Sequence, residues 1–108
     1  MTESTLTTGT QKQKVLFRCA THDAAPMSLC GSAPELGHWD LGAAVTMLAQ
    51  PGLRGDWDWC AQIELPLGQT VEYKFVKKTN GAARWESGSN HRITIIPGLS
   101  GLSEDFRE

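Results

Sequence analysis

The feature that most constrains the fold is a strand, a turn and a return strand in the last third of the chain. Val71, Tyr73 and Phe75 recur at every second position, so they are expected on one face of a strand. The Asn80-Gly81 pair that follows tolerates the positive φ angles of a tight hairpin turn. The chain is therefore predicted to double back there into a return strand that carries Trp85.

Short alternating runs of the same kind recur along the rest of the chain. In the first of them, Val15, Phe17 and Cys19 share one face, as expected of a strand with one buried side. A later apolar run is predicted as a strand over residues 43–48, although residues 41–50 also fit a helical turn. The predicted strands cover residues 15–19, 27–30, 43–48, 57–65, 71–76, 85–86 and 93–96.

Glycine, proline and asparagine interrupt these runs at intervals of roughly eight to twelve residues, and no long helix is indicated. This pattern predicts an all-β fold, an antiparallel β-sandwich of about seven to eight strands. The sandwich is assigned to residues 13–98 as one domain. Residues 1–12, rich in Thr, Ser and Gln, are expected to form a flexible lead-in. Residues 99–108 are expected to form a loose tail or linker.

Charge and hydropathy exclude several classes of partner. Ten Lys and Arg residues against twelve Asp and Glu residues leave no basic surface of the kind that nucleic acid or an anionic membrane requires. No run of eighteen apolar residues is present that would span a membrane. The chain as given also begins without a charged and apolar signal segment, so a cytoplasmic location is expected.

The reactive residue types do not form a catalytic or metal-binding pattern. Cys19, Cys30 and Cys60 fit neither a zinc ribbon nor a C-x-x-C redox motif. They are interpreted as small buried apolar residues, with a disulfide between two of them as the alternative. No Gly-rich phosphate loop or G-x-S-x-G elbow occurs, and there is no shared spacing among Glu64, Glu72, Glu86, His22, His38 and His91. Neither an enzyme active site nor a metal or cofactor is expected.

One tryptophan stands in a segment that glycine and proline keep irregular. Gly31, Pro34 and Gly37 disfavour regular structure before Trp39, and Asp40 follows directly. Such a tryptophan either closes over the core as a lid or leaves the face of its indole bare. A bare indole offers a flat apolar surface on which a ligand can stack.

Three separated motifs resemble those of one known family. They are GSAPELGHWD at residues 31–40, YKFVKK at residues 73–78 and WESGSN followed by His91. With the opening strand and in this order, they resemble the starch-binding domain of carbohydrate-binding module family 20, over residues 13 to 97. The resemblance implies an immunoglobulin-like β-sandwich, not itself an enzyme, that binds starch, glycogen or related α-1,4-glucans such as maltodextrins and cyclodextrins. Because that domain is appended to glucoamylases, cyclodextrin glucanotransferases and other glucan-active proteins, it also implies an attached catalytic domain in a longer chain.

The resemblance further implies the residues of a sugar site. Trp39 from GHWD and Trp85 from RWES would form an angled platform that stacks on consecutive glucose units of a curled chain. Lys74 from EYKF and Asn90 from GSNH would form hydrogen bonds with the sugar hydroxyls.

Two glutamates lie close to these residues in the sequence. Glu72 and Glu86 are further candidate acceptors for sugar hydroxyls. Glu86 is equally well explained as a structural partner of Arg84 or Lys74.

The family's second site is matched only in part. His22 stands where some members carry a tyrosine, and residues 51–56 contain no tyrosine. Trp57 is therefore the candidate stacking residue of a second site. By its phase in the predicted strand, Trp59 lies on the core side and forms either core or the wall of the groove.

A protein-binding sandwich is the main alternative, because exposed tryptophans are also frequent hot spots of protein interfaces. Protein interfaces have a wide apolar centre. In the sequence, Trp39 and Trp85 are instead surrounded by Gly, Ser, Asn, Asp and Lys, which favours a hydrated sugar site.

Overall fold

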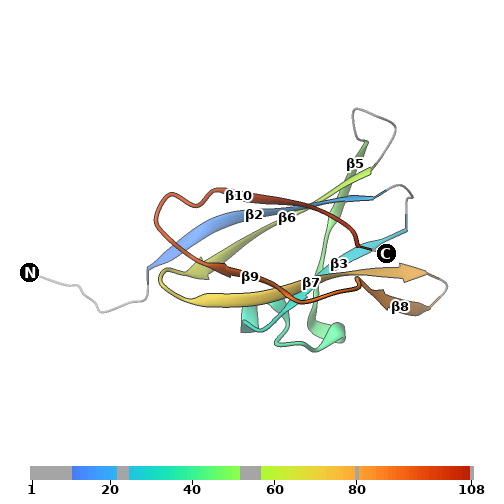
Figure 1. Ribbon diagram of the computed structural model, residues 1–108, viewed down its shortest axis with the longest axis horizontal. Helices are drawn as coiled ribbons and strands as arrows, with labels where there is room; N and C mark the ends of the chain where they lie inside the picture. The colour runs from blue at the N-terminus through green and yellow to red at the C-terminus, as the bar shows by residue number, and fades with distance from the viewer. Residues whose placement is uncertain (1–10, 22–24, 52–56, 80, 108) are drawn as a thin grey trace, which may run out of the picture.

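The chain folds into two β-sheets that lie face to face, as Figure 1 shows for the computed structural model of the protein. The structure describes residues 11–21, 25–51, 57–79 and 81–107. Within them the only helices are two short 3-10 turns, η1 (Pro34–Leu36) and η2 (Leu41–Ala43). No helix in these ranges is long and apolar enough to cross a membrane. The predicted β-sandwich is confirmed.

The first sheet is built on a long antiparallel pair. β2 (Lys12–Thr21) and β6 (Trp57–Pro66) pair along their whole length. β5 (Leu48–Pro51) lies at one edge, antiparallel to β6. β10 (Gly101–Asp105) lies at the other edge and runs parallel to β2. The order in this sheet is therefore β10-β2-β6-β5.

The second sheet is built on β7 (Thr70–Thr79), the strand that carries the EYKF motif. One edge of β7 pairs with β3 (Met27–Gly31), which in turn pairs with β4 (Val45–Thr46). The other edge of β7 pairs with two short strands. β9 (His91–Thr94) pairs with the first half of β7, and β8 (Ala82–Trp85) pairs with the second half. The site motifs of the sequence thus gather on one sheet.

The two sheets bury the side chains that alternation assigned to the inner faces. Val15, Phe17 and Cys19 of β2 are fully buried, as are Val71 and Phe75 of β7. Burying an apolar side chain of this size contributes about 1.5–3 kcal/mol, so this layer supplies most of the stability of the fold. The larger members of the core besides these are Met27, Leu29, Leu36, Met47, Trp59, Leu65, Tyr73, Ile95 and Phe106.

The apolar run predicted as one strand over residues 43–48, or as a helical turn over residues 41–50, is divided between three elements. η2 comes first, β4 then pairs with β3 in the second sheet, and β5 pairs with β6 in the first sheet. Between the two strands Met47 is buried, and its backbone N–H donates to the carbonyl of Met27. The run has no single period because it crosses from one sheet to the other at Met47, the one buried residue between Leu41 and Gln50.

The expectation of a loose tail at residues 99–108 is wrong for the part that the structure describes. β10 pairs with five residues of β2, and Phe106 after it is only 8% exposed and belongs to the core. The Gly/Ser composition concealed this strand, because none of its five residues is fully buried and such an edge strand needs few apolar residues. At the other end the first strand begins at Lys12, and residues 1–10 of the predicted lead-in lie outside the described residues.

All three cysteines are free. Cys19 and Cys30 are buried, and Cys60 is partly exposed. The interpretation as small buried apolar residues therefore holds for two of them, and the alternative of a disulfide does not apply. Burial raises the pKa of the Cys19 and Cys30 thiols, which keeps both protonated and poorly nucleophilic.

Candidate functional site

The loop that carries Trp39 is held in an uncommon backbone conformation. Gly37, His38 and Trp39 have φ angles of 89°, 52° and 63°, all in the left-handed region. Non-glycine residues adopt this region at a cost of order 1–3 kcal/mol, and such strain concentrates at functional sites. Backbone N–H groups fix the turn: that of Trp39 donates to the carbonyl of Gly31 at 2.8 Å, and that of His38 to the carbonyl of Ala33 at 3.1 Å. The His38 ring nitrogen Nδ1 lies 2.9 Å from the carbonyl oxygen of Ser32.

Two glycines of the GSAPELG motif are required by close packing. A Cβ atom on Gly31 would lie 2.4 Å from the backbone oxygen of Glu72, so only glycine lets the end of β3 approach β7 this closely. A Cβ atom on Gly37 would lie 2.8 Å from the backbone of Ala43, in addition to the positive φ. The two glycines therefore allow the loop that carries Trp39 to pack tightly against the sheet.

Trp85 reaches the same surface from β8. Its cross-strand partner is Val76, and side chains on one strand alternate between faces, so Trp85 shares the outer face of β7 with Glu72, Lys74 and Val76. The ring centres of Trp39 and Trp85 lie 6.3 Å apart, and the ring planes are inclined by 46°. The two residues are 37% and 38% exposed. We call this pair of indoles the tryptophan platform.

The predicted polar residues lie along the same face of β7. The Lys74 ammonium donates to the backbone carbonyl of Glu86 at 3.0 Å, which holds it beside Trp85. The Asn90 amide donates to Glu72 Oε1 at 2.9 Å. Glu72 is itself anchored, because its backbone N–H donates to the Ser32 hydroxyl at 3.0 Å. These residues place ammonium donors, an amide and a carboxylate next to the platform.

Glu86 is not on this surface. Its side chain is 0% exposed, and Oε1 accepts from the backbone N–H of Phe75 at 3.0 Å. His91 Nε2 lies 2.7 Å from the same oxygen, and Arg107 Nε donates to Oε2 at 3.0 Å. The candidate role as a sugar acceptor is therefore not supported, and the carboxylate partners are His91 and Arg107 rather than Arg84 or Lys74. Glu86 is a structural residue directly behind Trp85.

Arg107 is a site-supporting residue that the sequence did not indicate. Besides Glu86, its guanidinium donates to the carbonyl of Ser89 at 2.6 Å, and its own carbonyl accepts from the N–H of Ser87 at 2.9 Å. The loop between Trp85 and Asn90 is thus held by the residue that follows the last strand. An isolated arginine after a Gly/Ser-rich stretch carries no pattern from which this role could be read.

The two residues proposed for a second site take different positions. Trp59 is 6% exposed, and its indole N–H donates to the Thr21 hydroxyl at 2.9 Å, which confirms its predicted place on the core side. Trp57 is partly buried against the core and pairs with Thr21 in the ladder. His22 and residues 52–56, which would complete a groove around Trp57, lie outside the described residues. A second site at Trp57 stays a prediction.

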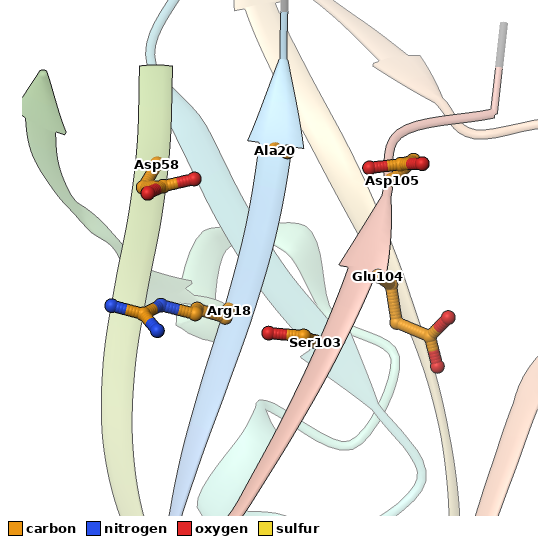
Figure 2. Close-up of a pocket in the computed structure, with 6 residues that line it drawn as sticks. All are labelled: Arg18, Ala20, Asp58, Ser103, Glu104 and Asp105. Carbon is orange, nitrogen blue, oxygen red and sulfur yellow. The ribbon is translucent and has the colours of Figure 1, made fainter. Parts of the chain in front are cut away.

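A hollow on the outer face of the first sheet has different chemistry. Figure 2 shows it on β2, β6 and β10, where Arg18 and Ala20 lie between Asp58 on one side and Ser103 and Asp105 on the other. It encloses about 280 Å³. None of the described residues that line it is aromatic, so these residues offer charged groups but no flat apolar surface for a sugar face.

Comparison with known proteins identifies the family of the chain. A family model described as "Starch binding domain" matches residues 12–104. Glucoamylase-1 of Arthroderma benhamiae is 37% identical over 94 residues, which are 85% of this chain and 15% of that protein. A cyclomaltodextrin glucanotransferase of Bacillus sp. (strain 17-1) is 39% identical over 66 residues, which are 61% of this chain and 9% of that protein.

Among solved structures, the glycoside hydrolase family 15 glucoamylase from Hypocrea jecorina superposes with a TM-score of 0.81. At 23% identity this is a likeness of fold; it covers 99% of this chain and 20% of that one. The chain therefore spans only a small part of the proteins that it matches. Because the family model covers most of the sequence, the chain belongs to the starch-binding domain family, carbohydrate-binding module family 20, a family of non-catalytic modules.

Proposed function

We propose that the tryptophan platform binds α-1,4-glucans by stacking, and that the domain thereby holds an attached glucan-active protein on its polysaccharide. The observation that carries the proposal is the pair of indoles, each more than a third exposed, with ring centres 6.3 Å apart and planes inclined by 46°. A flat plate would meet one glucose ring of a curled chain. Two inclined plates can each meet one of two consecutive rings.

The groups beside the platform match the rim of a sugar. Lys74 supplies ammonium protons, while Asn90 and Glu72 supply amide and carboxylate oxygens at one end of the surface. These groups are already oriented by hydrogen bonds within the protein, so little side-chain entropy is lost when a ligand binds. The pattern of exposed ring faces with polar edges favours a sugar over the wide apolar centre of a protein interface.

The affinity of one such surface should be modest. Covering about 80 Å² of each indole at about 25 cal/mol per Å² contributes about 2 kcal/mol, so the two rings together contribute about 4 kcal/mol, which corresponds to a Kd near millimolar. Exchange of water for protein hydrogen bonds adds little net free energy. A Kd on the order of micromolar to millimolar is expected, and tight retention on a granule would require several domains or sites acting together.

The relatives support the targeting role by their size. The chain matches 15% of Glucoamylase-1 and 9% of a cyclomaltodextrin glucanotransferase, so in those proteins the matching segment is one part of a much longer chain. We infer that this domain likewise works beside a catalytic domain that acts on glucan.

Titration with β-cyclodextrin, followed by calorimetry, tests the site. The wild-type domain should bind saturably, and Trp39→Ala and Trp85→Ala should each weaken binding by at least tenfold while the domain stays folded, because both rings are more than a third exposed. Leu48→Ala is the matched control, since Leu48 is an apolar residue 73% exposed on the other sheet. Unchanged binding by a folded Trp39→Ala/Trp85→Ala double mutant would refute the platform. Absence of binding by the folded wild type would instead favour a protein partner.

A further inference from the structure

A second hollow is lined by residues that are close neighbours in sequence of the two platform tryptophans. It encloses about 330 Å³, near the lower end of the range of roughly 300–1,000 Å³ that is usual for small-molecule sites. Its lining comes from η2 and from the β7–β8 hairpin: Leu41, Gly42, Lys78, Gly81, Ala82 and Ala83. We call it the hairpin hollow.

The hairpin hollow and the platform share one face of the second sheet. Ala83 pairs with Lys78, and Trp85 pairs with Val76, so Ala83 and Trp85 are two residues apart on β8 and point to the same side. At about 3.3 Å per residue this places Ala83 roughly 7 Å along the strand from Trp85. That step is close to the 6.3 Å between the ring centres of the platform.

The other wall of the hairpin hollow is formed by η2, which begins two residues after Trp39. Asp40 caps η2 by accepting from the N–H of Gly42 at 3.0 Å, and this turn brings Leu41 and Gly42 opposite the hairpin. Both walls of the hollow are therefore continuations of the two segments that carry the platform tryptophans. A ligand that lies across Trp39 and Trp85 can extend into it without leaving either segment.

The hollow is open because its residues are small. Ala82, Ala83 and Gly42 are exposed, and a Cβ atom on Gly81 would meet nothing within 4 Å. Leu41 and the alanines supply apolar surface for the C–H face of a sugar, and the exposed Lys78 supplies an ammonium donor for its hydroxyls. In the hollow of Figure 2, by contrast, four of the six described lining residues are charged: Arg18, Asp58, Glu104 and Asp105.

We propose that the hairpin hollow is a further sugar subsite, which takes the next glucose unit of an α-1,4-glucan whose two preceding units stack on the platform. This inference rests on the proposed function. The further subsite would make the protein selective for chain length. The two glucose units of maltose occupy the platform alone, whereas a longer oligosaccharide gains contacts with Leu41, Lys78 and Ala83.

The test compares the Kd of maltose with that of maltotetraose by NMR titration, and the ratio of the two is the chain-length gain. Ala83→Leu fills the hollow, and Leu41→Ala removes its apolar wall. Each variant should leave the Kd of maltose within about twofold of wild type and reduce the chain-length gain at least threefold. Ala20→Leu is the matched control, because it places the same atoms in the charged hollow on the other sheet and should leave both values unchanged.

The outcomes separate this inference from the proposed function. If wild-type protein binds neither sugar, the platform itself is refuted. If maltose binds but both variants keep the wild-type chain-length gain, the subsite is refuted and the platform stands. A large loss of maltose binding in both variants would also overturn the subsite, since the residues would then act by supporting the platform.

Discussion

Replacing Arg107 by methionine removes the guanidinium that joins the end of the chain to the back of the binding surface. The change leaves the buried Glu86 carboxylate with His91 and the N–H of Phe75 as its partners. It also removes the donor to the carbonyl of Ser89 in the loop before Asn90. Methionine keeps much of the length of the aliphatic part, so the loss is mainly that of the charged hydrogen bonds.

The cost follows from the burial of the two partners. Removing one partner of a buried ion pair costs about 3–5 kcal/mol when the remaining charge is left unpaired. Here the Glu86 side chain is 0% exposed, but that of Arg107 is 38% exposed, so water replaces part of what is lost. The His91 ring stays 2.7 Å from the carboxylate. A loss of about 2 kcal/mol in the free energy of unfolding is expected, which lowers Tm by about 8–16 °C in a domain of this size.

Urea denaturation of wild type, Arg107→Met and Arg18→Met measures this cost. Arg18 is an exposed arginine on the outer face of β2, so the same substitution there should change stability by no more than about 0.5 kcal/mol. The double mutant Arg107→Met/Glu86→Gln should be less destabilised than the sum of its single mutants, because the second change removes the unpaired charge. If Arg107→Met proves as stable as Arg18→Met, the reasoning about this network is wrong.

Three further outcomes are expected. Burial raises the pKa of Cys19, Cys30 and Tyr73, so the folded state keeps protons that the unfolded chain loses at high pH. The free energy of unfolding should therefore be unaffected by these groups below about pH 8 and should fall above it, by at most about 1.4 kcal/mol per pH unit for each group. Equal urea midpoints at pH 8 and pH 10.5 would contradict this. In native protein a thiol reagent should modify Cys60 first, because it alone of the three is partly exposed, whereas equal rates for all three would show that the core opens readily. A chain ending at Ser100 lacks β10 and Phe106 and should lose its cooperative unfolding transition, and retention of the wild-type Tm would show that this strand is dispensable.

Much of the fold was accessible from the sequence because alternation reports directly on burial. Val15, Phe17 and Cys19, and likewise Val71 and Phe75, point inward as their spacing indicates. The same argument failed for residues 41–50, because a segment that crosses between sheets changes partners and has no single period. It also failed for β10, where Gly101 and Ser103 conceal a strand whose pairing is with β2, far away in the sequence.

The site was predictable to the extent that its motifs specify it. Four of the five residues, Glu72, Lys74, Trp85 and Asn90, stand on or beside β7 and its two partners β8 and β9. The glycines of the first motif bring the fifth, Trp39, to the same face. The sequence did not indicate how deeply each polar side chain near the site is buried.

Glu86 lies beside Trp85 in sequence but points to the opposite, buried side of the sheet, as alternation along the strand requires. Its partner Arg107 is 21 residues away. An ion pair between residues so far apart in the chain depends on which strands lie side by side in the fold, and no local sequence pattern indicates this arrangement.

The most direct test of glucan binding through the platform uses the indole N–H resonances of the four tryptophans, followed by NMR while maltoheptaose is added. The resonances of Trp39 and Trp85 should shift together and saturate with one Kd, while that of Trp59, whose N–H is buried and donates to Thr21, should stay in place. A separate shift of Trp57 with its own Kd would reveal a second site. Saturable shifts of Trp57 or Trp59 with no change at Trp39 and Trp85 would contradict the account, because the glucan would then bind somewhere other than the platform.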